Sequence, residues 1–257
     1  LLNGLALSVN RGEVDRLATL PGVSGVYPDN PVHLNLTESV PLIGADHVWE
    51  MTDDQGWPIT GHGIRVAIVD TGIDYTHPDL GGCFGTGCKV VDGYDLRNDD
   101  PDPLDDGGHG THCAGVVAAN GTMRGVAPGA TLLAYKVLDG SGYGSISGII
   151  AGIDRAADPD QDPGTNDAVD IISLSLGYSG TPGDPWSLAV RAAAEQGILV
   201  AVAAGNQGPN FSNLDSPGLD AKAFTVGASD KDDMIASFSS RGPVPGFPNL
   251  IKPNIVA

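Results

Sequence analysis

Short, mostly apolar runs alternate with helical patterns along most of the chain. The apolar runs lie at residues 63–70, 131–137, 169–176, 198–205 and 223–229. Runs of this length and composition are typical of strands that are covered on both faces. Helical patterns lie between them, at residues 109–119, 145–157 and 185–197. The alternation predicts an α/β fold, with a parallel central sheet and helices on both of its faces.

The first 29 residues have a pattern of their own. Val14, Leu17 and Leu20 have helical spacing, and Pro21 ends that pattern. Apolar stretches at both ends of this helix predict a strand–helix–strand unit, too small to be stable alone. Residues 30–48 contain two prolines and no sustained period, which predicts a connector.

The charge of the chain limits its partners. It has 32 acidic and 13 basic residues, a formal net charge of −19, and all but four of the acidic residues are aspartates. This excess disfavours nucleic acids and anionic membrane surfaces as partners. The longest clean apolar run, 198–205, is too short to span a membrane.

Two residues stand where chemistry is expected in such a sheet. Asp70 ends the apolar run 63–70, and His109 begins a helix among glycines. Ligands of parallel sheets bind beyond the carboxyl ends of the strands. A buried carboxylate that orients an imidazole, with the imidazole as base, makes two thirds of a nucleophilic triad. For Asp70 alone, a helix cap or a structural hydrogen bond is the competing interpretation.

Five segments together resemble the successive motifs of the subtilisin-like serine proteases. They read VAIVDTGIDYTHPDL, GGHGTHCAGVVAA, ISLSLG, VAVAAGNQGP, and FSSRGP followed by KPNIVA. The histidine motif is similar to that of thermitase and proteinase K. The match extends from about residue 40 to residue 257, with Asp before His as in the family. It implies a serine endopeptidase in which Asp70 orients the imidazole, His109 is the general base, and Asn206 donates its amide to the oxyanion.

The resemblance also implies a domain organisation. Residues 1–29 resemble the C-terminal part of an inhibitor propeptide, residues 30–48 would form a connector with the maturation region, and residues 49–257 would form the peptidase domain. The implied partners are peptide or protein substrates and the chain's own propeptide. The implied location is extracellular.

The family nucleophile is the serine of a GTSMA motif, and the 257 residues contain no such motif. Each of the five Gly-Thr pairs is followed by a residue other than serine, and no G-x-S-x-G motif is present. We therefore expect a fragment whose sheet is incomplete at the C-terminus and which is inactive alone. The main alternative is a non-catalytic, subtilase-like binding domain. A metal hydrolase using His109, His112 and the acidic loop is weaker, because no third ligand is evident near the histidines.

The resemblance implies a substrate groove between two backbone segments. One contains Ser141 and Gly142, and the other contains Ser175, Leu176 and Gly177. A substrate would add to them as an extended strand, through main-chain hydrogen bonds. Asp215 falls at the expected floor of the first specificity pocket, where a carboxylate would favour Lys or Arg. The competing interpretation is a loop cap that points away from the pocket.

The loop before His109 resembles a calcium-binding loop of thermitase-like relatives. The matching ligands are Asp95, Asp100 and Asp102, and calcium would need further oxygens from carbonyls or water. A solvated acidic loop is the alternative.

The three cysteines divide into a pair and a single residue. Cys83 and Cys88 bracket a flexible loop that can close as a disulfide, whereas a zinc site would lack its second pair. Cys113 matches a cysteine beside the active histidine in thermitase and proteinase K relatives. That cysteine is usually a buried thiol, so we do not expect Cys113 to act as a nucleophile.

Overall fold

The computed structural model describes residues 9–23, 26 and 36–257. The chain divides at Asn35 into two units, and each is described by itself. In the first unit, a 3-10 turn, Arg11–Glu13, leads into helix α1, Val14–Ala18. This helix is shorter than the pattern predicts. The two strands predicted around it fall largely on residues 1–8, 24–25 and 27–29, outside the described residues.

The second unit contains one parallel sheet of seven strands in the order β2-β3-β1-β4-β5-β6-β7. The strands are β1 (Arg65–Asp70), β2 (Val90–Asp95), β3 (Thr131–Lys136), β4 (Ile171–Leu174), β5 (Leu199–Ala203), β6 (Phe224–Gly227) and β7 (Ile255–Val256). β3 pairs with one side of β1 and β4 with the other. The strand order therefore reverses at β1, and reversals of this kind are where parallel sheets bind ligands.

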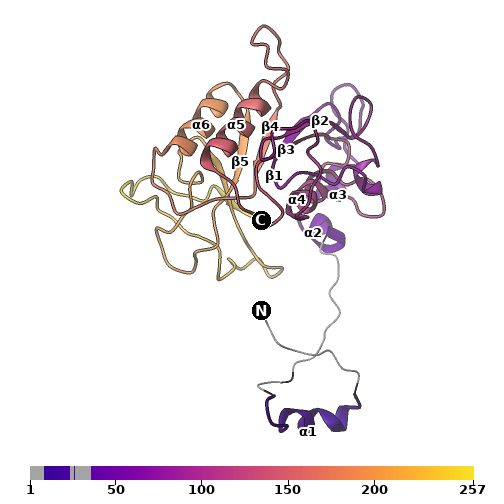
Figure 1. Cartoon of the computed structure of the whole chain (residues 1–257), viewed down its shortest axis with the longest axis vertical. Coiled ribbons are helices and arrows are strands. Elements are labelled where there is room, and N and C mark those ends of the chain that lie inside the picture. The colour runs from indigo at the N-terminus through magenta and orange to yellow at the C-terminus, as the bar shows by residue number, and fades with distance from the viewer. Residues whose placement is uncertain (1–8, 24–25, 27–35) are drawn as a thin grey trace. The chain divides into compact units, whose positions relative to one another are not determined.

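Helices cover both faces of the sheet (Figure 1). Helix α4 (His109–Ala118) packs on one face, against Val66 and Ile68 of β1. Helices α5 (Ile146–Ala157) and α6 (Pro185–Glu195) lie side by side on the other, against Ala67 and Val69. Successive side chains of a strand point to opposite faces, so β1 contributes to both cores. The three-layer α/β fold predicted from the apolar pattern is confirmed.

Local sequence sets where the two long helices of the second face begin. The Ser145 hydroxyl accepts a hydrogen bond from the Gly148 amide (3.1 Å) at the start of α5. At the start of α6, the Asp184 carboxylate accepts one from the Ser187 amide (2.8 Å), and Pro185 occupies the first helical position. These side chains satisfy amide groups that have no partner within the helix.

Four elements differ from the sequence prediction. The expected connector contains helices α2 (Leu36–Leu42) and α3 (Ala45–Val48), whose Val40 and Ala45 pack with Val116 of α4. Strand β2 has Asp92 and Gly93 in its middle, and β7 has two residues, so neither forms an apolar run.

Across the described part of the chain, no helix combines the length and the apolarity needed to cross a bilayer.

Candidate active site

Polar residues gather at the carboxyl edge of the sheet. Asp70 ends β1, and it lies opposite Lys136, the last residue of β3. Ser175 directly follows β4, and Gly205 and Asn206 follow β5 closely. Because all these strands are parallel, their carboxyl ends meet at one edge and bring residues from distant parts of the chain together.

Asp70 and His109 form the centre of this edge. Oδ1 of Asp70 lies 2.7 Å from Nδ1 of His109, and it also accepts a hydrogen bond from the Thr71 amide (2.7 Å). The Asp70 side chain is 1% exposed, whereas that of His109 is 53% exposed. An ionised carboxylate only accepts hydrogen bonds, so Nδ1 carries the proton and Nε2 keeps its lone pair. Within the described residues, Nε2 forms no hydrogen bond.

The glycines around His109 let the helix begin close to β1. A Cβ on Gly110 would collide with the carbonyl oxygen of Gly72 and lie 3.1 Å from Cβ of Asp70. The Gly110 amide instead donates to the Thr71 hydroxyl (2.8 Å). Only glycine permits this approach, and the approach puts the imidazole within reach of Asp70.

Asp105 fixes the first turn of α4. Its carboxylate accepts hydrogen bonds from the amides of Gly107 and Gly108 (both 2.8 Å) and of Thr111 (2.9 Å). Burial acts to raise the pKa of Asp105, but these donors and the Thr111 hydroxyl outweigh it and lower the pKa. Asp105 therefore stays ionised at the positive end of the helix dipole, where an anion is stabilising.

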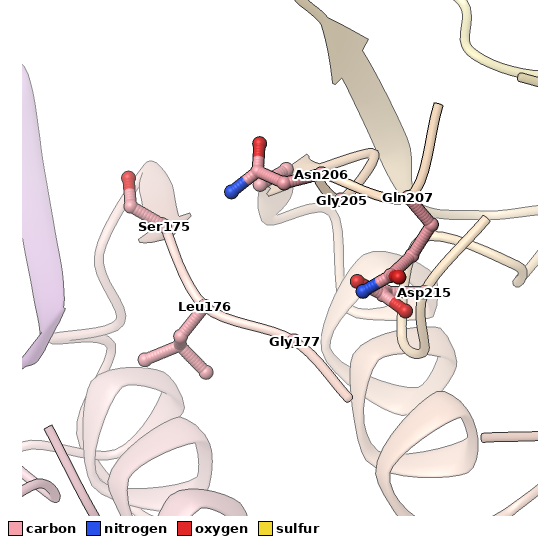
Figure 2. A pocket seen from close by; sticks show the side chains of 8 residues that line it. Ser175, Leu176, Gly177, Gly205, Asn206, Gln207 and Asp215 are labelled. Atoms are coloured by element: carbon pink, nitrogen blue, oxygen red, sulfur yellow. The ribbon is translucent and has the colours of Figure 1, made fainter. Parts of the chain in front are cut away.

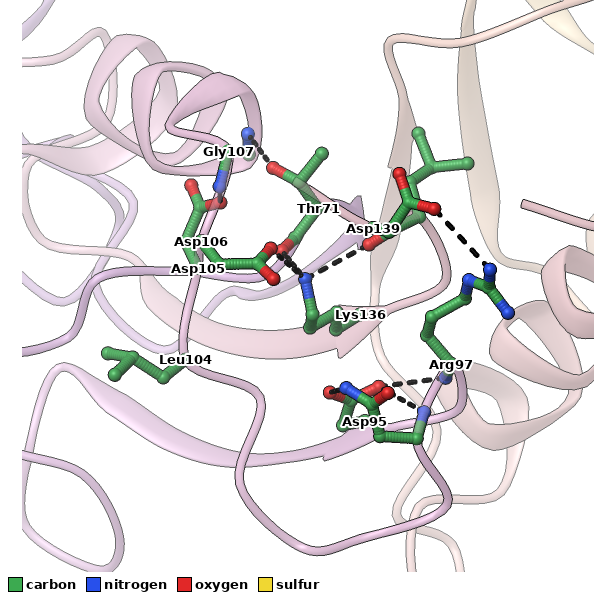
Figure 3. Close-up of polar contacts among 12 residues, drawn as sticks. Thr71, Asp95, Arg97, Leu104, Asp105, Asp106, Gly107, Lys136 and Asp139 are labelled. Carbon is green, nitrogen blue, oxygen red and sulfur yellow. Dashed lines mark hydrogen bonds and ion pairs between the residues drawn. The ribbon is translucent and has the colours of Figure 1, made fainter. Parts of the chain in front are cut away.

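Lys136 links three segments beneath this centre, as Figure 3 shows. Its ammonium donates to the carbonyl oxygens of Thr71 (2.8 Å) and Leu138 (3.0 Å), and it pairs with the carboxylate of Asp106. The Lys136 side chain is 3% exposed. The segment after Asp70 and the segment before His109 are thus held by one buried cation. Lys136 is not among the site residues predicted from the sequence, although a lysine inside an apolar run was a signal.

Cys113 lies on α4, four residues after His109. Its Sγ is 4.0 Å from both Nδ1 of His109 and Oδ2 of Asp70. Burial raises the pKa of the thiol to about 11, so it is neutral at physiological pH. Asp70, His109 and Cys113 are close enough to hold a metal ion. A neutral thiol is a poor ligand, however, and Asp70 is already engaged by His109 and Thr71.

A pocket of about 250 Å³ opens beside this centre. Ser175, Leu176 and Gly177 line one side, and Gly205, Asn206 and Gln207 line the other, with Asp215 at the side of Gln207 (Figure 2). In Figure 2 the Asn206 amide and the Ser175 hydroxyl face each other across the pocket. In the described residues the Asn206 side chain has no hydrogen-bond partner, so it is available to a ligand.

The second expected groove segment follows β3. Ser141 and Gly142 lie in an exposed turn whose amides at Ser141 (3.0 Å) and Tyr143 (3.1 Å) donate to the Asp139 carboxylate. Gly142 has a φ of 80°, which favours glycine. The structure therefore places Ser141 and Gly142 in a turn, and they are not among the residues that line the pocket.

The three expected calcium ligands are held in separate arrangements. The Asp95 carboxylate accepts hydrogen bonds from the amides of Arg97 and Asn98. The Asp100 carboxylate accepts one from the Asp102 amide. The Asp102 carboxylate accepts one from the Tyr75 hydroxyl (2.7 Å). Their oxygens do not converge within 4.8 Å among the described residues, unlike those of Asp158, Asp160 and Asp167. Calcium binding by Asp95, Asp100 and Asp102 stays a prediction.

Cys83 and Cys88 form a disulfide, with Cα atoms 5.6 Å apart. Gly81 lies two residues before the disulfide loop, and Lys89 directly follows the loop. The two residues pack closely, because a Cβ on Gly81 would lie 3.0 Å from Cβ of Lys89. The loop thus packs on itself next to β2.

Comparison with known proteins agrees with this arrangement. Residues 61–257 match the model of the subtilase family, peptidase S8. The chain is 37% identical over 255 residues to the minor extracellular protease Vpr and 43% identical over 216 residues to the serine protease AprX, both of Bacillus subtilis strain 168. It is 42% identical over 196 residues to thermitase of Thermoactinomyces vulgaris. These matches cover 89%, 77% and 74% of the chain.

The same matches cover only 29% of Vpr, 47% of AprX and 64% of thermitase, so the chain spans less than two thirds of each relative. A cold-adapted subtilisin-like serine proteinase has a similar structure, with a TM-score of 0.64 and 29% identity. That match covers 83% of this chain and 71% of the other. Family model, relatives and fold all agree: the chain belongs to the subtilase family of serine proteases.

Proposed function

We propose that this protein is a serine-type endopeptidase in which Asp70, His109 and Asn206 act on the scissile peptide bond. The observation that carries the proposal is the hydrogen bond from Nδ1 of His109 to the buried Asp70, beside a pocket with an available Asn206 amide. Family membership supports the same reaction.

Each residue has a distinct role in this proposal. Asp70 holds the imidazole in the tautomer whose Nε2 accepts a proton, and it stabilises the imidazolium that results. His109 takes the proton of the nucleophilic hydroxyl and returns it to the leaving amine. Asn206 donates a hydrogen bond to the oxyanion of the tetrahedral intermediate.

The nucleophile lies outside residues 1–257 in this proposal. The sequence of these residues has no GTS motif, and no hydroxyl reaches Nε2 of His109 within the described part of the chain. The 257-residue chain alone is then inactive, and only a protein that includes the serine is a peptidase. If the reading frame encodes no such serine, the chain is instead a non-catalytic, subtilase-like binding domain.

Its substrates are peptides or proteins, and its place of action is extracellular. Vpr is described as an extracellular protease, which supports the location. By the same proposal, residues 1–29 are the C-terminal part of an inhibitor propeptide, and that propeptide binds the peptidase domain from residue 49 onward.

The test is peptide hydrolysis by the protein expressed from its complete reading frame. His109→Ala should lower kcat by about 10⁴- to 10⁶-fold, because the proton transfer is lost. His112→Ala is the matched control, since His112 is an exposed residue of the same helix. It should leave kcat within about threefold of the parent. Equal losses in both variants, or turnover that is unchanged in His109→Ala, would contradict the proposed roles.

A further inference from the structure

Three aspartates outside the candidate active site converge on one point. Asp158, Asp160 and Asp167 each offer a carboxylate oxygen, and these oxygens lie within 4.8 Å of one another. Calcium binds oxygens at about 2.3–2.6 Å, so two oxygens that share one calcium ion lie within about 5 Å of each other. The three carboxylates therefore have the separation of a set of ligands around one ion.

The three aspartates lie in the segment that connects α5 to β4, at residues 158–170. This segment meets the start of β1. The Arg65 amide donates to the Asp170 carboxylate (2.8 Å), and the Arg65 guanidinium donates to the carbonyl of Asp167. Arg65 is the first residue of β1 and Asp70 is its last. The cluster thus lies at the amino edge of the sheet, opposite the edge that carries Asp70 and His109.

One oxygen of the cluster lacks a partner. Oδ1 of Asp158 is buried and forms no hydrogen bond within the described part of the chain. The other two carboxylates are engaged: that of Asp160 accepts hydrogen bonds from the Asp162 amide (2.9 Å) and the Thr165 hydroxyl (3.1 Å), and that of Asp167 accepts one from the Asp160 amide (3.1 Å). A buried carboxylate oxygen without a donor is costly, and a bound cation would remove that cost.

The charges of the cluster are not balanced by basic side chains. Among the described residues, no lysine or arginine forms an ion pair with Asp158, Asp160 or Asp167. Burial and the neighbouring charges of Asp160 and Asp167 raise the pKa of Asp158. Carboxylates this close repel one another when all are ionised. A divalent cation among them would turn this repulsion into attraction.

The segment is held in place, and solvent can reach it. The Val169 amide donates to the carbonyl of Ala156 (3.1 Å), which closes the segment against the last turn of α5. Asp158 and Gln161 line a pocket of about 490 Å³ that lies between α5 and Tyr94 of β2. An ion can therefore reach the cluster through this pocket without unfolding the segment.

We propose that Asp158, Asp160 and Asp167 bind one calcium ion, which links the end of α5 to the segment before β4. Carboxylates are hard ligands, which disfavours zinc and copper. Calcium accepts six to eight oxygens in irregular arrangements, whereas magnesium needs a nearly ideal octahedron. Backbone carbonyls and water would complete the shell. The proposal does not depend on the proposed peptidase function.

The first part of the test counts bound calcium by isothermal titration calorimetry. It uses the protein expressed from its complete reading frame, with His109→Ala to prevent self-digestion. Asp158→Asn and Asp167→Asn should each bind one calcium ion fewer than this parent, or bind that ion about 10²-fold more weakly. Asp232→Asn removes the same charge at an exposed position and should change neither number nor affinity. Magnesium should bind this site at least about 10-fold more weakly than calcium.

The second part separates ion binding from a purely structural role by thermal unfolding. In chelator, Asp158→Asn should melt at the same temperature as the parent or higher, because it relieves repulsion and its free Oδ1 has no hydrogen bond to lose. In calcium it should melt below the parent, because only the parent gains the stabilisation of a bound ion. Equal calcium binding by the parent, Asp158→Asn and Asp167→Asn would overturn the proposal. So would an equal fall in melting temperature of Asp158→Asn in calcium and in chelator.

Discussion

Nδ1 of His109 lies 2.7 Å from Oδ1 of Asp70, and the two side chains differ sharply in exposure, 53% against 1%. The buried carboxylate fixes one ring nitrogen, and the exposed half of the ring presents the other to solvent. A proton taken up at Nε2 creates a cation beside a carboxylate that water screens little. This geometry favours an imidazole that acts as a base and returns to the same orientation after each transfer.

Asp70→Asn should lower kcat by about 10⁴-fold, because an amide can stabilise the wrong imidazole tautomer and cannot stabilise the imidazolium. The measurement is kcat over a pH series. Asp79→Asn is the control, since Asp79 is a buried aspartate that accepts hydrogen bonds from the amides of Thr122 and Met123 and does not line the pocket. It should lower the melting temperature and leave the kcat of the folded enzyme unchanged. A similar kcat in Asp70→Asn and the parent would refute the role of Asp70.

Lys136→Met should lower kcat by about 10²-fold, because the segments that carry Asp70 and His109 lose their shared anchor and small displacements are costly. The KM for peptides should change much less, since Lys136 does not line the pocket. Lys89→Met is the control, because Lys89 is a half-buried lysine that donates to the carbonyls of Pro128 and Ala130 and does not contact these segments. If both variants lose only stability and keep kcat, Lys136 has a purely structural role.

Cys113 should react slowly with iodoacetamide at neutral pH. Burial raises the pKa of its thiol to about 11, so the reactive thiolate is scarce until the pH approaches that value. The alkylation rate, followed by mass spectrometry, should rise steadily between pH 8 and about 11 in the folded protein. Cys113→Ser should retain peptidase activity. Rapid modification at pH 7 would contradict a neutral, partly buried thiol.

Calcium should raise the melting temperature if Asp95, Asp100 and Asp102 bind it. Ions bound only by the native state would stabilise it by about 3 kcal/mol at about 100-fold above Kd. The Asp100→Asn, Asp102→Asn double variant should lose this increment between calcium and chelator. The Asp160→Asn, Asp167→Asn double variant should keep the part of the calcium-dependent rise in melting temperature that the loop before His109 provides. This comparison distinguishes calcium binding by that loop from binding by Asp158, Asp160 and Asp167. Equal melting with calcium and chelator would exclude the site.

The central residues were predictable because each follows a strong local pattern. Asp70 ends a strand buried on its last five residues, and His109 begins a helix at the same edge of the sheet. The role of Lys136 was not predictable: a lysine inside the apolar run 131–137 marks an unusual position, but the sequence does not show what its ammonium contacts. Only the register that pairs Asp70 with Lys136 places its ammonium below the centre.

The elements missed by the pattern lie where tertiary contacts outweigh local preference. Helix α2 contains Pro41 and is only seven residues long, and Val40 within it packs with Val116 of α4. Strand β2 shifts its register between Val90 and Asp92 and has an exposed side chain at Asp92. Short helices and edge strands gain most of their stability from such packing, which one sequence does not reveal.

The most direct test of the proposed function is labelling with a serine-directed phosphonate, followed by mapping of the modified residue. The protein expressed from its complete reading frame should be labelled on one serine outside residues 1–257, with matching loss of peptidase activity. His109→Ala should abolish labelling, and the 257-residue chain alone should neither be labelled nor cleave peptides. Stoichiometric labelling of a serine within residues 1–257, accompanied by turnover, would contradict the account.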